Sequence, residues 1–407
     1  MLMEASIAYR SRPASKSQFG FHTIPNLVEL EEWERNRLIE IGPLAISILK
    51  KSMAIVANAV KSPRTGMDWL VKIIFGSIPP NQRNLAYDLT CAAEECLPLH
   101  FFRADVLGNG QIAELQCPGS GWGYTFALEE HYGIEPSQVI EAIRRFTKGR
   151  KASWWLHDLN HEPSVRHLEH ACNKNGIDLK VYNAAEFDPD SVELMIKRPP
   201  LPELIATEKG QQLLRRWMNG KVELDLLPTM VPETKYLMCL LYHPQTMGYF
   251  TDEERQLAPP TYFITSADQI LKPKEGYREQ SIENIFLHYR KGFIVKYGGA
   301  KKELRGGCHA VYNLGAKSMK FAARKTLLKR ALADHESGES WILQRFIDTQ
   351  RKIVWDKQGT ERMRYPMFRV EYYVSENGNP SIVQTTATFR SDWKVHARSD
   401  ARLGLCK

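Results

Sequence analysis

The sequence predicts an α/β fold of two or three packed subdomains, with a mainly helical region at its N-terminal side. Apolar residues recur at helical spacing over residues 27–60 and 84–96, which predicts amphipathic helices. Beyond them, short strand-like runs alternate with helical ones. The chain has 407 residues, too many for one ordinary hydrophobic core. We therefore expect several subdomains that can enclose a cleft.

Bulk composition indicates a soluble, folded chain that meets anionic partners. Hydrophobic residues make up 43% and charged residues 25% of the chain, close to globular averages. No apolar run is long enough to span a membrane. A formal net charge of +8 favours nucleotide phosphates, an acidic substrate or nucleic acid as partners. Nucleic acid is the least favoured of these, because basic residues are spread through the chain and no nucleic-acid-binding module is recognisable.

Cysteine usage and the N-terminal segment indicate a cytoplasmic protein. The seven cysteines are odd in number, irregularly spaced and without a C-x-x-C pair, a pattern that suits a reducing compartment. Residues 1–18 are basic and Ser-containing but lack an apolar core and a secretory cleavage site. We interpret this run as a loose arm, with an organelle transit peptide as the alternative. The oligomeric state is not predicted.

Secondary-structure signals divide the rest of the chain. Two strand-like runs, 99–107 and 111–116, flank the turn signal Gly108-Asn109-Gly110 and predict a hairpin. Further signals predict a helix over 136–147, a βαβ unit over 152–183, a strand ending in Lys296, a helix over 318–335, and β-rich runs over 341–347, 368–374 and 381–390. The proline-punctuated stretch 197–260 has no firm assignment.

The predicted hairpin carries a candidate metal site. Residues two apart on a strand point to the same face, so Arg103 shares a face with Asp105, and Glu114 shares one with Gln116. If the two faces coincide, Asp105, Glu114 and the Gln116 carbonyl supply hard oxygen ligands for Mg²⁺. Arg103 can hold a carboxylate or acyl phosphate through its planar fork. The alternative is an ordinary solvated hairpin.

A second candidate site follows a strand near residue 296. Glycine pairs bracket a basic loop there, and the backbone amides of such a loop can approach phosphates closely. The pattern is not a Walker loop, and the alternative is a glycine-rich hairpin with surface lysines. A later strand offers Gln344 to an adenine edge, and Arg390, His396 and Arg398 follow as candidates for polyphosphate or substrate. The residues we assign to nucleotide binding are Lys296, Gly298, Gly299, Arg305, Gly306, Gly307 and Gln344, with Lys301 and Lys302 in the same loop.

This order of motifs resembles the circularly permuted ATP-grasp carboxylate–amine ligases, the group that includes glutathionylspermidine synthase-like enzymes. Their pattern is R-x-D on one strand and E-x-N on the next, with a lysine and glycine loop far downstream. Here Arg103-Ala104-Asp105, Glu114-Leu115-Gln116 and Lys296 match it. The likeness covers roughly residues 95–407. Gln116 stands where the family usually has Asn.

The resemblance implies an ATP-grasp fold in which successive segments of the chain have different roles. It implies a helical N-terminal region (1–94), a permuted segment with the metal-binding hairpin (95–147), a βαβ-type pre-ATP-grasp-like domain (148–260) and nucleotide-binding lobes (261–407). It further implies Mg²⁺ on Asp105, Glu114 and Gln116, ATP on the nucleotide residues above, and catalytic roles for Arg103 and Arg390. The implied reaction joins a small carboxylate to an amine (an amino acid, peptide or polyamine) through an acyl phosphate, with release of ADP and phosphate.

Three other interpretations stay open. A chain that kept the fold and lost ligation would be a nucleotide-binding scaffold or sensor, and a phosphotransferase would use the same cleft. The third is a zinc site formed by His157, His161, His167 and His170. A helix start near residues 160–163 disfavours the zinc site, because it prevents one continuous helix from carrying all four histidines.

Overall fold

The computed structural model has a mixed α/β architecture, which confirms the predicted class. It describes residues 5–6, 22–23, 27–62, 66–117, 121–156, 159–271, 279–288, 292–299, 304, 310–349, 351–354, 361–390 and 401–407. The chain divides into two compact units, unit 1 with residues 1–46, 96–228 and 348–407, and unit 2 with residues 47–95 and 229–347. Helix α1 (Glu32–Lys61) begins in unit 1 and ends in unit 2. The four segments predicted from the sequence remain a prediction.

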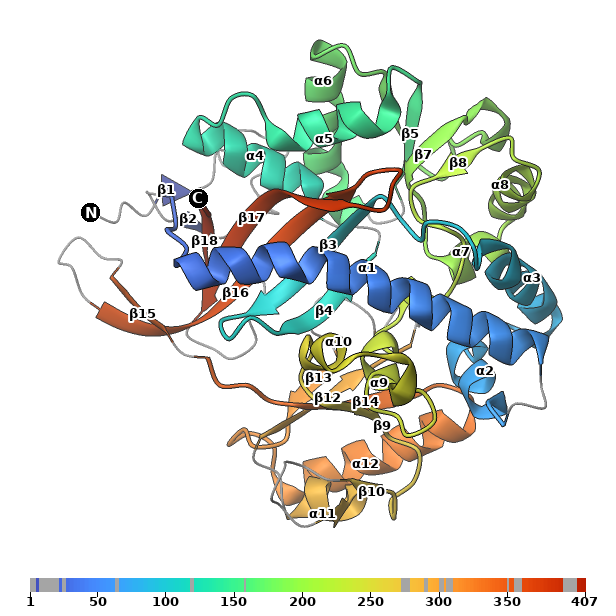
Figure 1. Cartoon of the computed structure of the whole chain (residues 1–407), viewed down its shortest axis with the longest axis vertical. Coiled ribbons are helices and arrows are strands. Elements are labelled where there is room, and N and C mark those ends of the chain that lie inside the picture. Colours follow the sequence, from blue (N-terminus) through green and yellow to red (C-terminus); the bar gives the residue numbers. More distant parts are fainter. Residues whose placement is uncertain are drawn as a thin grey trace. The chain divides into compact units, whose positions relative to one another are not determined.

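Unit 1 is built on a large, mainly antiparallel sheet (Figure 1). Its strands in spatial order are β1 (Ala5–Ser6), β2 (His22–Thr23), β18 (Arg402–Leu405), β17 (Pro380–Arg390), β16 (Glu361–Val374), β3 (Phe101–Leu107) and β4 (Ile112–Gln116), with β15 (Arg351–Val354) on β16. The predicted hairpin is confirmed as β3–β4. Its turn uses Gly110 at φ +78°, a backbone conformation that favours glycine.

One face of this sheet is apolar and covered by the first half of α1 (Figure 1). Phe102 and Tyr372 stack on that face with ring centroids 4.6 Å apart. The Tyr372 hydroxyl donates a hydrogen bond to the Leu38 carbonyl of α1. Because side chains alternate along a strand, Arg103 and Glu371 point to the opposite face.

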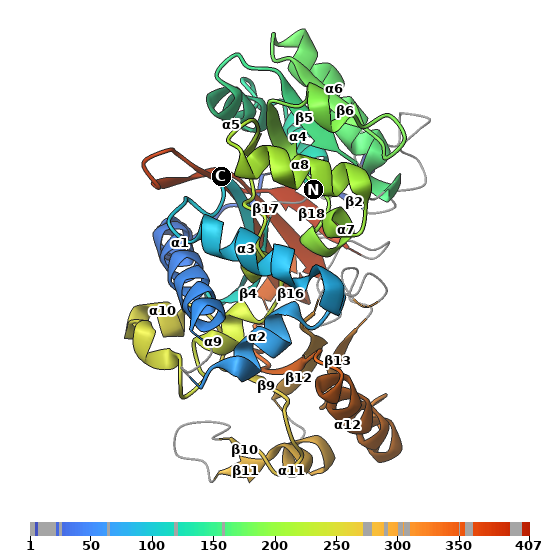
Figure 2. The ribbon, with the colours of Figure 1, turned by 90° about the vertical axis from the view of Figure 1, so that its right-hand side faces the viewer.

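A small parallel sheet completes unit 1 and confirms the predicted βαβ unit. Its order is β6 (Leu179–Tyr182), β5 (Ala152–Trp155), β7 (Leu194–Lys197) and β8 (Glu223–Leu224). Helix α6 (Glu162–Lys174) joins β5 to β6, and Figure 2 shows it beside them. The other helices of unit 1 are α4 (Trp122–Tyr132), α5 (Gln138–Thr147), α7 (Leu201–Ile205) and α8 (Glu208–Met218).

A hydrophobic core and a buried carboxyl group connect the two sheets of unit 1. Phe101 and Tyr373 of the large sheet pack in one cluster with Phe146 of α5 and Trp154 of β5. Asp225, just after β8, accepts hydrogen bonds from the backbone amides of residues 100 and 101, both at 2.8 Å. The start of β3, two residues before Arg103, is therefore held against the carboxyl end of the parallel sheet.

Unit 2 is a four-stranded antiparallel sheet with helices on both faces. Its strands in spatial order are β13 (Val311–Asn313), β12 (Phe293–Tyr297), β14 (Trp341–Arg345) and β9 (Thr261–Phe263). Helices α11 (Ile282–Leu287) and α12 (Phe321–Glu336) lie on one side and α9 (Leu237–Leu240) on the other (Figures 1 and 2). The remaining elements are α2 (Asp68–Phe75), α3 (Arg83–Ala93), α10 (Asp252–Gln256), β10 (Ile270–Leu271) and β11 (Gln280–Ser281). None of the described helices combines the length and apolar character needed to cross a bilayer.

We predict that Gly123→Ala destabilises unit 1, because helix α4 packs directly against α6 at this glycine. A Cβ atom on Gly123 would lie 2.4 Å from the backbone oxygen of Ser164. Backbone cannot move aside cheaply, so we expect a loss of about 1–3 kcal/mol in unfolding free energy by urea titration. The control is Gly248→Ala, where a Cβ would meet no atom within 4 Å. Equal stability of the two variants would contradict the prediction.

Candidate functional site

The four predicted residues of the hairpin share one face of the large sheet. In the β3–β4 ladder Arg103 is paired with Gln116, and Asp105 with Glu114. Directly paired residues project to the same side. The two strand faces therefore coincide, as the metal-site hypothesis required.

Strand β16 lies next to β3 and adds two charged residues to the same sheet face. The sequence analysis missed both of them. Glu371 is paired with Arg103, and Arg369 with Asp105. The signal was present, since Arg369-Val370-Glu371 repeats the spacing of Arg103-Ala104-Asp105. What the sequence lacked was the pairing of strands more than 250 residues apart.

Two β-bulges flank this polar face. Ala113 is an extra residue of β4 beside Asp105, and Val383 is an extra residue of β17 beside Glu371. A bulge bends a strand and redirects the neighbouring side chain, and bulges are common next to active sites. Here they lie beside the two carboxylates closest to Arg103 in the ladder.

Arg103 is a buried cation held between carboxyl groups. Its side chain donates from Nε to Asp105 Oδ1 at 2.7 Å and from Nη2 to Asp105 Oδ2 at 3.3 Å. Burial alone would lower the pKa of Arg103, but the charges of Asp105 and Glu371 outweigh this effect and raise it. Burial raises the pKa of Glu371 to about 8 against the opposing influence of Arg103. The face thus combines a permanent cation with a carboxyl group that holds its proton near neutral pH.

The hairpin residues fit a magnesium ion that is shared with phosphate oxygens. Among the described residues no three His, Cys, Asp or Glu side chains are grouped as an all-protein metal site requires. Mg²⁺ is usually held by one or two carboxylates together with substrate phosphates. Asp105 and Glu114 supply two carboxylates, and the Gln116 carbonyl a third hard oxygen. Hydrogen bonding to Arg103 still leaves lone pairs on Asp105 for a metal.

Arg390 lies on the same face of the sheet but apart from this group. It is buried at the end of β17, four residues beyond Thr386, which is paired with Arg369. At about 3.3 Å per residue, Arg390 is roughly 13 Å along the strand from the line of cross-strand partners that contains Asp105. His396 and Arg398, also singled out in the sequence, lie outside the described residues.

Unit 2 holds the second candidate site, around Lys296 on β12. Lys296 is buried and donates from Nζ to Gln344 Oε1 at 2.7 Å. Gln344 in turn donates from Nε2 to Thr261 Oγ1 at 3.0 Å. Gln344 thus orients the lysine, and its contact with an adenine edge stays a prediction. Ile294, Ile342 and Phe263 share this face of the sheet and give it an apolar floor.

Gly298 and Gly299 are explained by close packing. A Cβ on Gly298 would lie 2.4 Å from the Tyr236 ring, and one on Gly299 would lie 2.5 Å from the Tyr297 hydroxyl. Tyr236 is buried and its hydroxyl accepts a hydrogen bond from the Ser340 amide at 3.0 Å. Glycine is therefore required here whether or not phosphate approaches.

A further lysine adjoins the site from a stretch that the sequence left unassigned. The backbone amide of Lys235 donates to the Gly298 carbonyl at 3.1 Å. This hydrogen bond holds the backbone of Lys235 against the residue that directly follows β12. The remaining predicted loop residues, Lys301, Lys302, Arg305, Gly306 and Gly307, lie outside the described residues.

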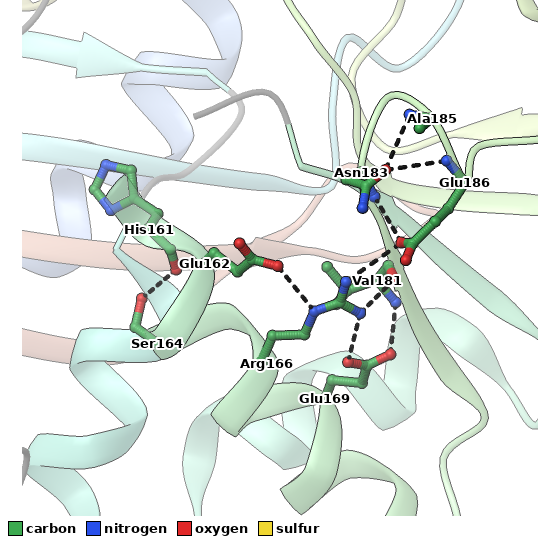
Figure 3. A network of polar contacts seen from close by, with 9 residues as sticks. All are labelled: His161, Glu162, Ser164, Arg166, Glu169, Val181, Asn183, Ala185 and Glu186. Carbon is green, nitrogen blue, oxygen red and sulfur yellow. Dashed lines mark hydrogen bonds and ion pairs between the residues drawn. The ribbon is translucent and has the colours of Figure 1, made fainter. Parts of the chain in front are cut away.

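The histidine cluster does not form a metal site among the described residues. His161 bonds through Nδ1 to the Tyr124 hydroxyl at 3.1 Å, and His167 bonds through Nε2 to Glu130 at 2.6 Å. His170 is exposed, and His157 lies outside the described residues. Figure 3 shows that the dominant polar network of this region is centred on Arg166, with ion pairs to Glu162, Glu169 and Glu186. That network ties α6 to the end of β6.

Comparison with known proteins supports a shared fold and leaves the activity open. No family model matches the chain, and no curated protein matches it significantly. A glutathione synthetase-like effector from Globodera pallida, solved in its apo form, is similar with TM-score 0.51 and 10% identity, over 93% of this chain and 88% of the effector. At this identity the likeness shows the fold alone.

Two further solved structures match more weakly. A D-cycloserine synthetase matches with TM-score 0.29 and 13% identity, over 57% of this chain and 90% of its own. A putative γ-glutamylcysteine synthetase from Methylobacillus flagellatus matches with TM-score 0.41 and 10% identity, over 83% and 85%. Scores this low add no argument about this protein.

We predict that Asp225→Asn flattens the loss of stability with rising pH. Burial raises the pKa of Asp225 from 3.8 to about 8. The folded chain therefore keeps a proton that the unfolded chain loses above pH 4, and stability falls as pH rises from about 4 to 8. Asn keeps the accepting oxygen and cannot ionise. In urea titrations at pH 5 and pH 8, we expect the pH-dependent loss to shrink by more than about 1 kcal/mol; an unchanged slope would contradict this.

Proposed function

We propose that this protein is an ATP-dependent ligase of the circularly permuted ATP-grasp class. It joins a carboxylate to an amine and releases ADP and phosphate. One observation carries the proposal: two carboxylates and an amide, Asp105, Glu114 and Gln116, share a sheet face with the buried guanidinium of Arg103. Such a face suits a metal, a phosphoryl group and a carboxylate together. The fold shared with a glutathione synthetase-like protein supports it.

The catalytic chemistry of the proposal is positioning and charge compensation. Arg103 would hold the acid substrate and offset the charge of its acyl phosphate. Bound magnesium would neutralise phosphate oxygens on the side of Asp105 and Glu114. No protein nucleophile is needed, because the carboxylate attacks the γ-phosphorus and the amine then displaces phosphate. Arg390 remains a proposed substrate contact.

Nucleotide binding is assigned to the apolar floor and lysines of unit 2. The adenine would rest on Ile294 and Ile342, and Lys296 would offset α- and β-phosphate charge. Gln344 would fix the direction of the Lys296 ammonium through the 2.7 Å hydrogen bond. Lys235, adjoining Gly298, is a second candidate cation.

The proposal is tested by a screen for phosphate release that requires two substrates at once. Amino acids, small peptides and polyamines would be supplied in pairs with ATP and Mg²⁺, and products identified by mass spectrometry. A condensed product formed with ADP and phosphate supports the ligase. A phosphorylated acceptor without condensation would instead identify a phosphotransferase, and ATP binding without turnover of any pair would indicate a scaffold or sensor.

We predict that Lys296→Met weakens ATP binding roughly tenfold or more, because a charge-assisted contact to phosphate is lost while the volume of the side chain is kept. Isothermal calorimetry with the full chain measures the change. Lys325→Met, on the exposed side of α12, is the matched control. Equal affinity of the two variants would remove Lys296 from the nucleotide site.

We predict that Glu114→Gln abolishes condensation while ATP binding stays measurable, because the variant lacks one of two carboxylates proposed for Mg²⁺. The readout is product formation over a range of Mg²⁺ concentrations. Glu193→Gln, which changes an exposed carboxylate of the same unit, should behave as wild type. Near-normal turnover of Glu114→Gln at ordinary Mg²⁺ would show that the hairpin is only structural.

A further inference from the structure

Helix α12 and the turn before it carry positive charge that no nearby acidic residue offsets. The thirty residues 304–333 contain seven Lys or Arg and no Asp or Glu. The exposed cations among the described ones are Lys317, Lys320, Lys325, Lys329 and Arg330. In the described part of the chain, only Arg330 of these five forms an ion pair, with Asp334 at 3.7 Å. Four lysines are therefore exposed with their charge uncompensated.

The start of α12 departs from the electrostatics of other helices in this chain. The N-terminal end of a helix carries partial positive charge and favours Asp or Glu nearby. The first turn of α12 has no acidic residue, and its N-cap, Lys320, makes no side-chain cap. By contrast Ser137, Thr207 and Thr251 cap α5, α8 and α10, and each of these helices has an acidic residue in its first turn. Positive charge is thus concentrated at this end of α12 at a cost to the helix, as is typical of functional surfaces.

Phe321 adds an exposed aromatic ring to the same end of the helix. Its side chain is 50% exposed, and the neighbouring Ala322 and Ala323 are exposed as well. A single exposed apolar residue needs no explanation by itself. Here it directly follows Lys320 and lies four residues before Lys325. Lysines around an exposed aromatic ring are typical of surfaces that touch the boundary between lipid headgroups and acyl chains.

The core of unit 2 fixes α12 on the side of the sheet opposite Lys296. Arg324 is buried and donates from Nε to the Phe286 carbonyl of α11 at 2.8 Å. Leu327 packs in one core with Val295 of β12. Because side chains alternate along a strand, Lys296 projects to the other face. A partner that covers α12 would therefore not cover the face that carries Lys296, and nucleotide affinity should not depend on the exposed lysines.

We propose that α12 docks this protein on an anionic phospholipid bilayer, with Lys317, Lys320, Lys325 and Lys329 at the headgroups and Phe321 at the boundary with the acyl chains. Each lysine near such a surface is worth a factor of about five in binding, so that four lysines favour an anionic over a neutral surface by roughly a few hundredfold. Docking of this kind requires no membrane-spanning helix. The inference does not rest on the proposed ligase function.

The chemistry of α12 fits a bilayer better than an acidic peptide or a nucleic acid. A peptide is usually held in a groove or by backbone hydrogen bonds, whereas α12 is a helix whose backbone bonds are internal. Proteins that bind nucleic acid rely on arginine forks and on aromatic platforms that stack with several bases. The four uncompensated cations here are all lysines, compact point charges that suit an array of mobile anionic headgroups.

Vesicle co-sedimentation of the full chain tests the inference. Vesicles of phosphatidylcholine alone are compared with vesicles in which part of it is replaced by phosphatidylserine. We expect at least about thirtyfold tighter binding to the anionic vesicles, and a loss of this preference at high salt. The triple variant Lys320→Glu, Lys325→Glu, Lys329→Glu should abolish the preference, while arginine at the same three positions should keep it. Phe321→Ala should weaken binding without removing the preference.

A matched control separates α12 from the net charge of the whole chain. The triple variant Lys151→Glu, Lys174→Glu, Lys221→Glu removes the same charge from exposed positions of unit 1 and should keep the preference. Equal losses in the two triple variants, or equal binding of wild type to both kinds of vesicle, would overturn the inference. Binding to polyglutamate or to single-stranded RNA without binding to the anionic vesicles would overturn it as well. Thermal melts show whether each variant is folded.

Discussion

The burial of the Arg103 guanidinium on strand β3 is the constraint on which the candidate site depends. A cation removed from water is tolerated only where carboxylates and hydrogen bonds compensate it. Asp105 provides a two-point contact on the same strand, and Glu371 provides a second carboxyl group across the ladder. Strand pairing sets these positions, and the apolar face beneath α1 keeps the register fixed, since a slip of one residue would turn the charges into the core.

Unit 2 also contains a buried cation, and its hydrogen-bond partner is an uncharged side chain. Lys296 is buried on an apolar sheet face and is oriented by the neutral amide of Gln344. Because an amide is uncharged, this hydrogen bond orients the Lys296 ammonium without forming an ion pair. The glycines beside it serve packing against Tyr236 and Tyr297. Their presence in the sequence is thus no evidence of phosphate binding by itself.

Local patterns predicted much of the fold, while long-range pairing escaped prediction. Turn chemistry at residues 108–110 and alternation along 99–116 were sufficient for the hairpin, whereas the shared face of Asp105 and Glu114 follows from the strand register, which the sequence left open. The spacing of apolar residues, which differs between helices and strands, was likewise sufficient to predict the βαβ unit. Glu371 was missed because its meaning depends on pairing with Arg103, 268 residues away in the chain. Lys235 was missed because prolines and short turns hide the periodicity of its region.

The central claim, ligation through an acyl phosphate, is tested most directly by following one oxygen atom. A carboxylate substrate found by the screen would be enriched in heavy oxygen and condensed with its amine in the presence of ATP. If the carboxylate attacks the γ-phosphorus and the amine then displaces phosphate, one labelled oxygen must appear in the released phosphate, with ADP as the nucleotide product. Unlabelled phosphate, or AMP with pyrophosphate, would contradict the account.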